Sequence, residues 1–367
     1  MLISEARDLW DPEPGWLNTA SYGLPPRPTI DAMHAALEEW RRGAGPWTTW
    51  DLSTGRARAA FAGLVGVPVD DVAVGATVSA MLSVVGAALP AGARVVVPEI
   101  EFTSNLFPWL VHADRGVRID TVPAGRLADM IDSRTDLVSF SLVQSATGQI
   151  AAIDEIVAAA RRHGALVVGD ASQAAGWLPV DATPFDVLVC AGYKWLMTPR
   201  GAAFGYFSPA VRDRFRPLQA NWYAGEDIAD SYYGPSMRLA ASARRFDLSP
   251  AWFSYVGAAP SLELLTEIGV DAVRAHNVAL ANRFRAGLGL PPGASAIVSV
   301  DRSDAVDRLA AAGVRAAVRH GRLRASFHLY TTEADVDRAL AALDAGDARH
   351  RRDGGGVGDG GGVGRLA

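Results

Sequence analysis

Short apolar runs alternate with helical patterns through much of the chain, and this alternation constrains the fold more than any other feature. The strand-like runs cover residues 72–74, 94–98, 137–143, 165–169 and 186–190. Parallel strands need a crossover connection, usually a helix, so the alternation predicts a mainly parallel sheet with helices on both faces. Ligands of such sheets bind at the carboxyl ends of the strands. The residues that follow the runs are therefore the functional candidates.

Two of these residues form a chemical pair. Asp170 follows the run 165–169, and Lys194 lies shortly after the run 186–190. Neighbouring strands would bring the carboxylate and the amine to one edge of the sheet. Pyridoxal 5'-phosphate chemistry needs this pair, because a lysine holds the aldehyde as a Schiff base and an acid keeps the pyridine nitrogen protonated. Taken singly, Asp170 also fits a helix cap, and Lys194 a solvated surface position.

The composition is that of a globular enzyme. The 367 residues are 49% hydrophobic, enough for a sizeable core, and the net charge of −5 comes without a basic stripe, so nucleic acid is not an expected partner. The single cysteine, Cys190, excludes an intramolecular disulfide, and the histidines lack metal-site spacing. No segment has the pattern of a signal peptide or a membrane span. We therefore expect a cytoplasmic protein with no metal and no membrane partner.

The surroundings of Asp170 and Lys194 resemble a known family. The chain reads Asp170-Ala171-Ser172-Gln173, then a strand, then Gly192-Tyr193-Lys194-Trp195 and Pro199-Arg200-Gly201. This order resembles the class V aminotransferase superfamily, which includes cysteine desulfurases, kynureninases, isopenicillin-N-epimerase-like proteins and C–S lyases of thiol metabolism. The resemblance covers nearly the whole chain. It implies pyridoxal phosphate as cofactor, a fold type I architecture with a seven-stranded sheet and a small second domain, and a homodimer.

The pattern along the chain, together with this resemblance, predicts four segments. Residues 1–25 form an N-terminal segment beside the small domain, 26–248 a large cofactor-binding domain, and 249–345 a small C-terminal α+β domain. The small domain is expected to hold helices near 251–267, 270–289 and 333–344. Residues 346–367 are Gly-rich and of low hydrophobicity, which predicts a disordered tail.

The cofactor phosphate has a candidate site at Ala76 and Thr77, in a turn between a strand and an apolar helix. A helix N-terminus offers backbone N–H groups to a phosphate, although the same turn alone also fits a plain helix cap. By the resemblance, the N–H groups of Ala76 and Thr77 and the Thr77 hydroxyl are phosphate ligands. Tyr193 resembles the phosphate-binding aromatic residue of kynureninase-like members. On the sequence alone, packing is an equal alternative for Tyr193.

The resemblance implies four further cofactor contacts. Phe102 resembles the residue that stacks on the pyridine face, and Gln173 the side chain that hydrogen-bonds the phenolic oxygen. Ser145 stands where desulfurases tend to have Asn. Ser249 lies in a region that reaches the phosphate of the neighbouring subunit in the family. A core position is the alternative for Phe102.

Two arginines are candidates for the carboxylate of an amino-acid substrate. Arg324 lies in a stretch that resembles the R-x-S-x-x-x-Y pattern of the family, where it maps to the carboxylate-binding arginine, and Arg319 maps to a second active-site arginine. A solvated basic face is the alternative for this cluster. Tyr22 could line the substrate entrance, with core packing or a dimer contact as equal alternatives.

A missing feature narrows the chemistry. Desulfurases of this type carry a nucleophilic cysteine on a loop between the two arginines, whereas only residues 320–323 separate them here. Cys190 lies within a strand-like run, where we expect a buried structural role. Desulfuration through an enzyme persulfide is therefore not expected.

The expected reaction is β-elimination from an S-substituted cysteine, because the apolar segment 246–253, which contains Trp252, looks like that of actinobacterial C–S lyases. Lys194 is the expected base for the Cα proton. An aminotransferase or an amino-acid epimerase is the alternative within the family. A protein that binds the cofactor without catalysis, as a partner subunit, is the alternative of another class.

Overall fold

The computed structural model describes residues 1–302 and 305–353. Within them, one large sheet has seven strands in the order β1-β7-β6-β5-β4-β2-β3. These strands are β1 (Val72–Gly75), β2 (Arg94–Pro98), β3 (Arg118–Val122), β4 (Leu137–Ser141), β5 (Leu166–Asp170), β6 (Val187–Ala191) and β7 (Ala203–Phe207). Strand β7 is antiparallel to both of its neighbours, and the other adjacent pairs are parallel. The predicted α/β class with a mainly parallel seven-stranded sheet is confirmed.

The strand directions gather several chain segments at one edge. Strands β1 and β6 both run antiparallel to β7, so β1 points the same way as the parallel strands. The carboxyl ends of β1, β2, β4, β5 and β6 therefore share one edge of the sheet. In a doubly wound sheet this is the edge at which ligands bind.

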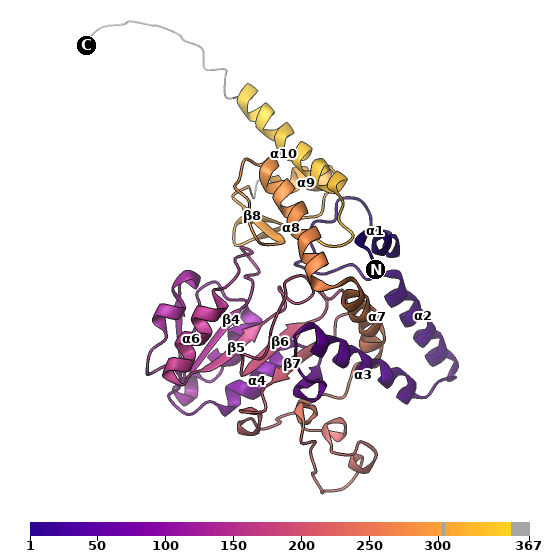
Figure 1. The fold of residues 1–367 in the computed structure, drawn as a ribbon, viewed down its shortest axis with the longest axis vertical. Coiled ribbons are helices and arrows are strands. Elements are labelled where there is room, and N and C mark those ends of the chain that lie inside the picture. Colours follow the sequence, from indigo (N-terminus) through magenta and orange to yellow (C-terminus); the bar gives the residue numbers. More distant parts are fainter. Residues whose placement is uncertain (303–304, 354–367) are drawn as a thin grey trace, which may run out of the picture.

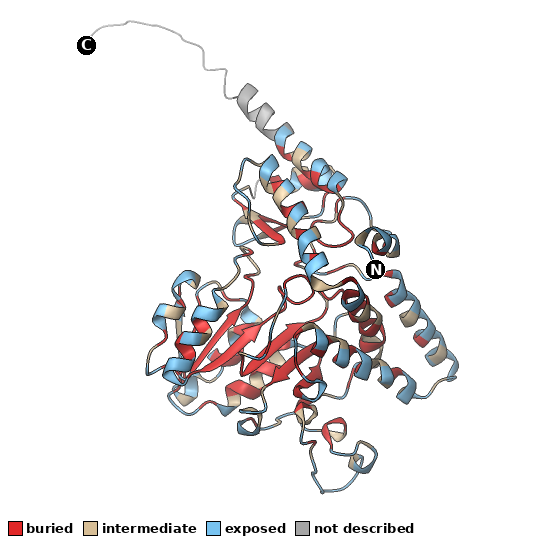
Figure 2. Cartoon of the chain, in the orientation of Figure 1, coloured by how far each residue is buried: buried red, intermediate tan, exposed pale blue. Residues whose placement is uncertain are grey.

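Helices cover both faces of the large sheet (Figure 1). The helices of the described residues are α1 (Ile3–Ala6), α2 (Arg27–Arg42), α3 (Trp47–Leu64), α4 (Val78–Ala88), α5 (Phe107–Leu110), α6 (Ile153–His163), α7 (Trp252–Ile268), α8 (Val270–Gly287), α9 (Val306–Ala311) and α10 (Glu333–Asp353). Side chains of α3, α6 and α7 join one core, and those of α4 and α5 join another. Val72 and Val74 belong to the first core and Ala73 to the second, because successive strand residues point to opposite faces. Strands β1, β2 and β4 to β7 are buried along their length, whereas the edge strand β3 is half-exposed (Figure 2).

A second, antiparallel sheet has the order β8-β10-β9, from β8 (Ile297–Val300), β9 (Ala317–Arg319) and β10 (Arg322–Ser326). It forms a core with α8 and α10, to which Phe284 and Val336 contribute. The N-terminal segment joins this core through Leu17, whose N–H donates to Arg315 O at 2.9 Å and whose carbonyl accepts from Ser326 N–H at 2.9 Å.

The proposed segment boundaries stay a prediction. Helix α7, which begins soon after the expected boundary at Ser249, packs against α2 and α3. Helix α10 extends to Asp353, beyond the expected end near 344, and residues 354–367 of the predicted tail lie outside the described residues. Among the described helices, none has both the length and the apolar character to cross a membrane.

Candidate active site

A cavity of about 240 Å³ opens at the carboxyl edge of the large sheet. Its lining includes the predicted residues Ala76, Thr77, Phe102, Asp170, Tyr193 and Lys194, together with Val78, Ser79, Ser104, Ser172, Ala191, Arg200 and Gly201. A larger hollow of about 660 Å³ lies beside Trp10 and Arg338. That hollow contains neither a lysine nor a strand end of the large sheet, so its size does not make it the active site.

Asp170 and Lys194 lie together in this cavity, as predicted, although their roles remain predictions. Asp170 ends β5, and Lys194 follows β6; both side chains are buried. Burial raises the pKa of Asp170 and lowers the pKa of Lys194, and in each case the charge of the partner opposes the shift. A lowered pKa makes the neutral amine of Lys194 more accessible, which is the form needed for a nucleophile or a base.

Lys194 is also the only lysine in the sequence. All the remaining residues of the Lys/Arg type are arginines. Residue counting alone would have singled out Lys194, independently of any motif.

The predicted phosphate turn lies at the N-terminus of α4. Thr77 caps this helix, and its Oγ1 accepts from Ala80 N–H at 3.3 Å. Residues 76–79 all line the cavity, so the unpaired N–H groups of the first helical turn lie beside it. A helix N-terminus with nearby hydroxyl groups fits a phosphate.

The aromatic side chains surround the lysine. Lys194 Nζ lies 5.2 Å from the ring centroid of Phe102 and 5.7 Å from that of Tyr193. Phe102 is 44% exposed, so it is not a core residue. The alternative of core packing is excluded for Phe102, and its stacking role stays a prediction.

Glu101 and Arg200 are polar neighbours of the site that the sequence did not identify as functional. The buried Glu101 carboxylate accepts from Ser141 N–H at 2.7 Å and from Phe102 N–H at 2.8 Å, so it fixes the backbone before the Phe102 ring. The Arg200 guanidinium carbon lies 4.2 Å from the Tyr193 ring centroid. No carboxylate within the described residues pairs with Arg200, although its side chain lines the cavity.

Gln173 and Ser145 do not line the cavity, and their roles stay predictions. Gln173 donates from Nε2 to Ala20 O at 3.0 Å and accepts at Oε1 from Trp195 Nε1 at 2.7 Å. It therefore ties the segment after Lys194 to the N-terminal segment. The carbonyl oxygen of Ser145 accepts from Arg324 Nη1 at 2.7 Å.

Arg324 is buried on β10 without a carboxylate partner among the described residues. Its Nη2 donates to Ser21 Oγ at 2.8 Å, and its Nε has no hydrogen-bond partner in the described part of the chain. Burial, and then the charge of Arg319, lower the pKa of Arg324 to about 10, so it remains cationic at neutral pH. A buried, unpaired guanidinium is costly unless an anion completes it. This environment fits a carboxylate ligand.

Arg319 lies nearby but is exposed, and its Nη2 donates to the same Ser21 Oγ at 3.1 Å. Between the two arginines the chain turns tightly from β9 to β10 through His320 and Gly321, which have φ of 50° and 72°. Tyr22 is exposed, with its ring centroid 4.6 Å from that of Trp16, and it does not line the cavity. No sequence motif indicated Ser21.

Cys190 is buried within β6 and does not line the cavity. Burial raises the pKa of its thiol, which disfavours the nucleophilic thiolate. Within the described residues, no cluster of His, Cys, Asp or Glu has the arrangement of a metal site. Ser249 is exposed and does not line the cavity, so its expected role in a neighbouring subunit stays a prediction.

Residues 54–311, well over half of the chain, match the family model for class V aminotransferases. The chain belongs to this family. The family resemblance and its cofactor, pyridoxal 5'-phosphate, are therefore confirmed. The buried Asp170 and Lys194 and the α4 N-terminus fit this cofactor's nitrogen, aldehyde and phosphate.

Two curated relatives span most of the chain. An uncharacterized aminotransferase of Bacillus subtilis, YcbU, is 30% identical over 311 residues, which cover 79% of this chain and 82% of the relative. Isopenicillin N epimerase of Streptomyces clavuligerus is 27% identical over 396 aligned positions, covering 91% and 95%.

Solved structures confirm the fold type I architecture. The cystine C–S lyase C-DES, in complex with cysteine persulfide, matches with a TM-score of 0.82 at 20% identity and covers 90% of this chain and 97% of its own. The cysteine desulfurase CsdA of Escherichia coli matches with a TM-score of 0.81 at 19% identity and covers 95% and 99%.

Proposed function

We propose that this class V enzyme catalyses β-elimination from an S-substituted cysteine and so cleaves a C–S bond. The observation that carries the proposal is the set of charges in the cavity. Lys194 is its one amine, and Arg200 is a cation without a carboxylate partner among the described residues. Elimination needs one base and benefits from a cation near the departing thiolate. The buried Cys190 supports a reaction that needs no enzyme thiol.

Arg324 is the proposed anchor of the substrate carboxylate. Its Nε lacks a partner in the described part of the chain, and guanidinium groups bind carboxylates through two parallel hydrogen bonds. Arg319 and Tyr22 are proposed to border the same space from its exposed side. The Ser21 hydroxyl contacts both guanidinium groups and would fix their positions relative to each other.

The proton and the leaving group follow from these positions. When bound, pyridoxal phosphate supplies an electron sink that makes the Cα hydrogen of an amino acid acidic. Lys194 Nζ would accept that proton, and the Asp170 carboxylate would pair with the pyridine nitrogen and keep it protonated. The C–H electron pair becomes the Cα–Cβ double bond as the Cβ–S bond breaks, and its electron pair leaves with sulfur near Arg200. The released aminoacrylate hydrolyses to pyruvate and ammonia.

Epimerisation of an amino acid is the second candidate, because isopenicillin N epimerase aligns with 91% of the chain. Inversion at Cα needs a proton carrier on each face. Besides Lys194 and Asp170, Tyr193 is the titratable side chain of the cavity lining that could serve, and it stacks with Arg200. Elimination uses Lys194 alone, and for this reason we favour it.

A product assay separates the candidate reactions. The purified enzyme with S-methylcysteine, S-benzylcysteine or cystine, and no keto acid, is expected to release a thiol or persulfide together with ammonia and pyruvate. Thiol reagents, ammonia detection and mass spectrometry measure these products. Amino transfer that continues only with an added keto acid, or Cα exchange with solvent deuterium without release of sulfur, would contradict elimination.

We also propose that the enzyme works as a homodimer with its active sites near the interface. The segment 218–237 carries large apolar side chains that the single chain leaves exposed, including Tyr233 at 95% and Met237 at 75%. Such a patch is typical of an interface. Ser249 is proposed to reach the phosphate of the partner subunit. Sedimentation equilibrium is expected to give twice the chain mass, and a monomer mass at micromolar concentration would contradict the proposal.

A further inference from the structure

Strand β1 lies at the edge of the large sheet, and two side chains and one backbone N–H contact its outer side where another strand would otherwise pair. Arg58 Nη1 donates to Val72 O at 2.7 Å, and Val74 N–H donates to Asp247 Oδ1 at 2.8 Å. Leu248 N–H donates to Val74 O at 3.2 Å. An edge strand exposes unpaired backbone groups, so these contacts take the place of a neighbouring strand.

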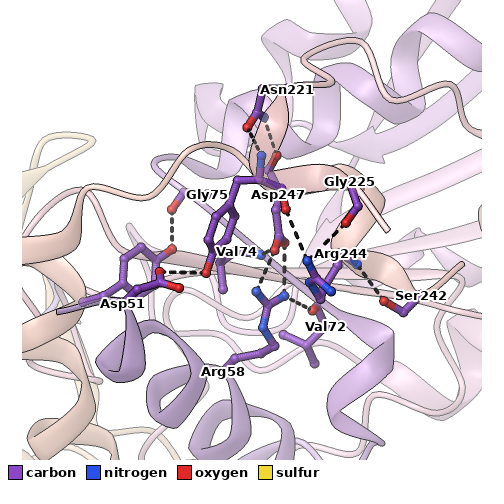
Figure 3. Close-up of polar contacts among 12 residues, drawn as sticks. Asp51, Arg58, Val72, Val74, Gly75, Asn221, Gly225, Ser242, Arg244 and Asp247 are labelled. Atoms are coloured by element: carbon purple, nitrogen blue, oxygen red, sulfur yellow. Dashed lines mark hydrogen bonds and ion pairs between the residues drawn. The ribbon is translucent and has the colours of Figure 1, made fainter. Parts of the chain in front are cut away.

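Arg58 and Asp247 form a two-pronged ion pair, from Nη2 to Oδ2 at 2.6 Å and from Nη1 to Oδ1 at 3.1 Å. Their side chains are 7% and 0% exposed. Figure 3 shows the Arg58 side chain extending from α3 toward the Asp247 carboxylate, beside Val72 and Val74. Removal of one partner would leave a buried charge unpaired, so the geometry of the pair is strongly constrained.

The strand that this pair fixes leads directly into the phosphate turn. Gly75 ends β1, and Ala76 and Thr77 follow. The Tyr255 hydroxyl lies 2.8 Å from Gly75 O, and a side chain at Gly75 would come within 3.0 Å of Met81 Cε. Tyr255 and Met81, which belong to the cores on opposite faces of the sheet, therefore both contact the end of β1. A displaced β1 would displace the N–H groups that face the cavity.

We propose that Arg58 and Asp247 are positioning residues for the cofactor phosphate: they lock β1 so that the Ala76–Thr77 turn keeps its binding geometry. Neither side chain lines the cavity, so both act through the backbone of Val72 and Val74. The inference rests on the proposed phosphate role of the turn, and it holds for any of the candidate reactions.

The backbone of Asp247 also holds the chain that leads to Ser249. Asn221 Nδ2 donates to Asp247 O at 2.9 Å, and Arg244 Nη2 donates to Gly225 O at 3.2 Å (Figure 3). The segment 221–248 is therefore attached to β1 through Asp247. Breaking the pair is therefore expected to loosen the attachment of this segment to β1.

The test measures how tightly the apo-enzyme binds pyridoxal phosphate, and in parallel pyridoxal, which lacks the phosphate. In Arg58→Met and Asp247→Asn, the Kd for pyridoxal phosphate is expected to rise about tenfold or more, equal to about 1.4 kcal/mol, whereas the Kd for pyridoxal changes less than about threefold. An unchanged Kd for pyridoxal phosphate in folded variants would overturn the proposal. An equal loss of affinity for pyridoxal phosphate and for pyridoxal would also overturn it, because that result indicates a general loss of structure and not a specific effect on the phosphate site.

Two controls separate positioning from stability. Arg94, whose side chain is 9% exposed, pairs with Asp120 and Asp132 at 2.6 and 2.8 Å at the opposite end of the strands. The two carboxylates are 45% and 40% exposed, so Arg94 matches the arginine of the Arg58–Asp247 pair but its partners are less buried. Arg94→Met is expected to lower Tm while both Kd values stay within about twofold of wild type. A loss of pyridoxal phosphate affinity in Arg94→Met equal to that in Arg58→Met would refute a specific role of the β1 edge.

If the single variants do not fold, the double variant Arg58→Met/Asp247→Leu keeps the test decisive. An apolar pair of similar volume often preserves stability where a buried ion pair is replaced. This variant is expected to fold and still to lose pyridoxal phosphate affinity, because the partners of Val72 O and Val74 N–H are gone. Thr77→Val tests the turn itself. If Thr77→Val leaves the Kd unchanged, the phosphate site is misplaced; if Thr77→Val weakens binding and the double variant does not, the positioning role alone fails.

Discussion

Lys194→Ala is expected to abolish the borohydride-trapped cofactor adduct and to reduce turnover by at least about 10²- to 10⁴-fold, the range that a positioned proton-transfer group contributes. The physical reason is that Lys194 is the only lysine of the chain and lines the cavity with Asp170. No other side chain of the sequence carries an amine that could hold the aldehyde, and Lys194 is also the proposed base for the Cα proton. Peptide mass mapping after borohydride treatment measures the first effect, and product release measures the second.

Lys194→Arg is the matched control for charge. It preserves a cation beside Asp170 but supplies no amine at neutral pH, because the guanidinium stays protonated. It is expected to be as inactive as Lys194→Ala while keeping more of the wild-type stability. A side-chain adduct that persists in the lysine-free variant, or turnover within tenfold of wild type, would show that the catalytic amine has been assigned wrongly. An adduct found only on the N-terminal peptide would come from the α-amino group, which is the remaining amine of the variant, and would leave the assignment of Lys194 intact.

The sheet could be predicted where strands are buried on both faces. The runs that became β1, β2, β4, β5 and β6 are continuous and apolar, as buried parallel strands require. Strand β3 was not among the expected strands, because it lies at the opposite edge and its sequence Arg118–Val122 is mostly polar and half-exposed. Strand β7 was also missed, since it is a five-residue run with a glycine in its centre.

Part of the cavity lining could be predicted, because the sequence shows which residues follow the strand ends. Asp170, Lys194 and Thr77 all follow buried runs, and the topology then places those ends side by side. The contacts made across long sequence distances could not be predicted in this way. Ser21 contacts Arg324, about three hundred residues away, and a single serine in a loop carries no signal for such a contact.

The buried ion pair has the same limitation. Arg58 and Asp247 lie on α3 and in a loop, 189 residues apart in the sequence. Each resembles an ordinary surface charge until the open edge of β1 brings them together. Backbone groups of an edge strand create a requirement for partners, but the sequence does not say which side chains meet that requirement.

Arg324→Met is expected to weaken amino-acid binding by about 1.5–3 kcal/mol, the usual contribution of hydrogen bonds to a charged group, or roughly 10- to 150-fold in Kd. The reason is the unsatisfied environment of the guanidinium: it is buried, its Nε lacks a partner among the described residues, and no carboxylate of the described chain neutralises it. Methionine fills a similar volume, so the loss reports the charge and the hydrogen bonds. Spectral titration of the holoenzyme with a candidate amino acid measures the change.

Arg319→Met is the control, because Arg319 shares the contact with Ser21 but is exposed. A charge in water contributes less than a desolvated one, so this variant is expected to weaken binding by less than about tenfold. The Kd for pyridoxal phosphate should stay near the wild-type value in both variants, because the phosphate turn lies on α4, away from β10. An unchanged amino-acid titration in Arg324→Met would remove Arg324 from the substrate site. A titration weakened equally by both substitutions would indicate that the two arginines attract the substrate through their combined charge, without a specific carboxylate contact at Arg324.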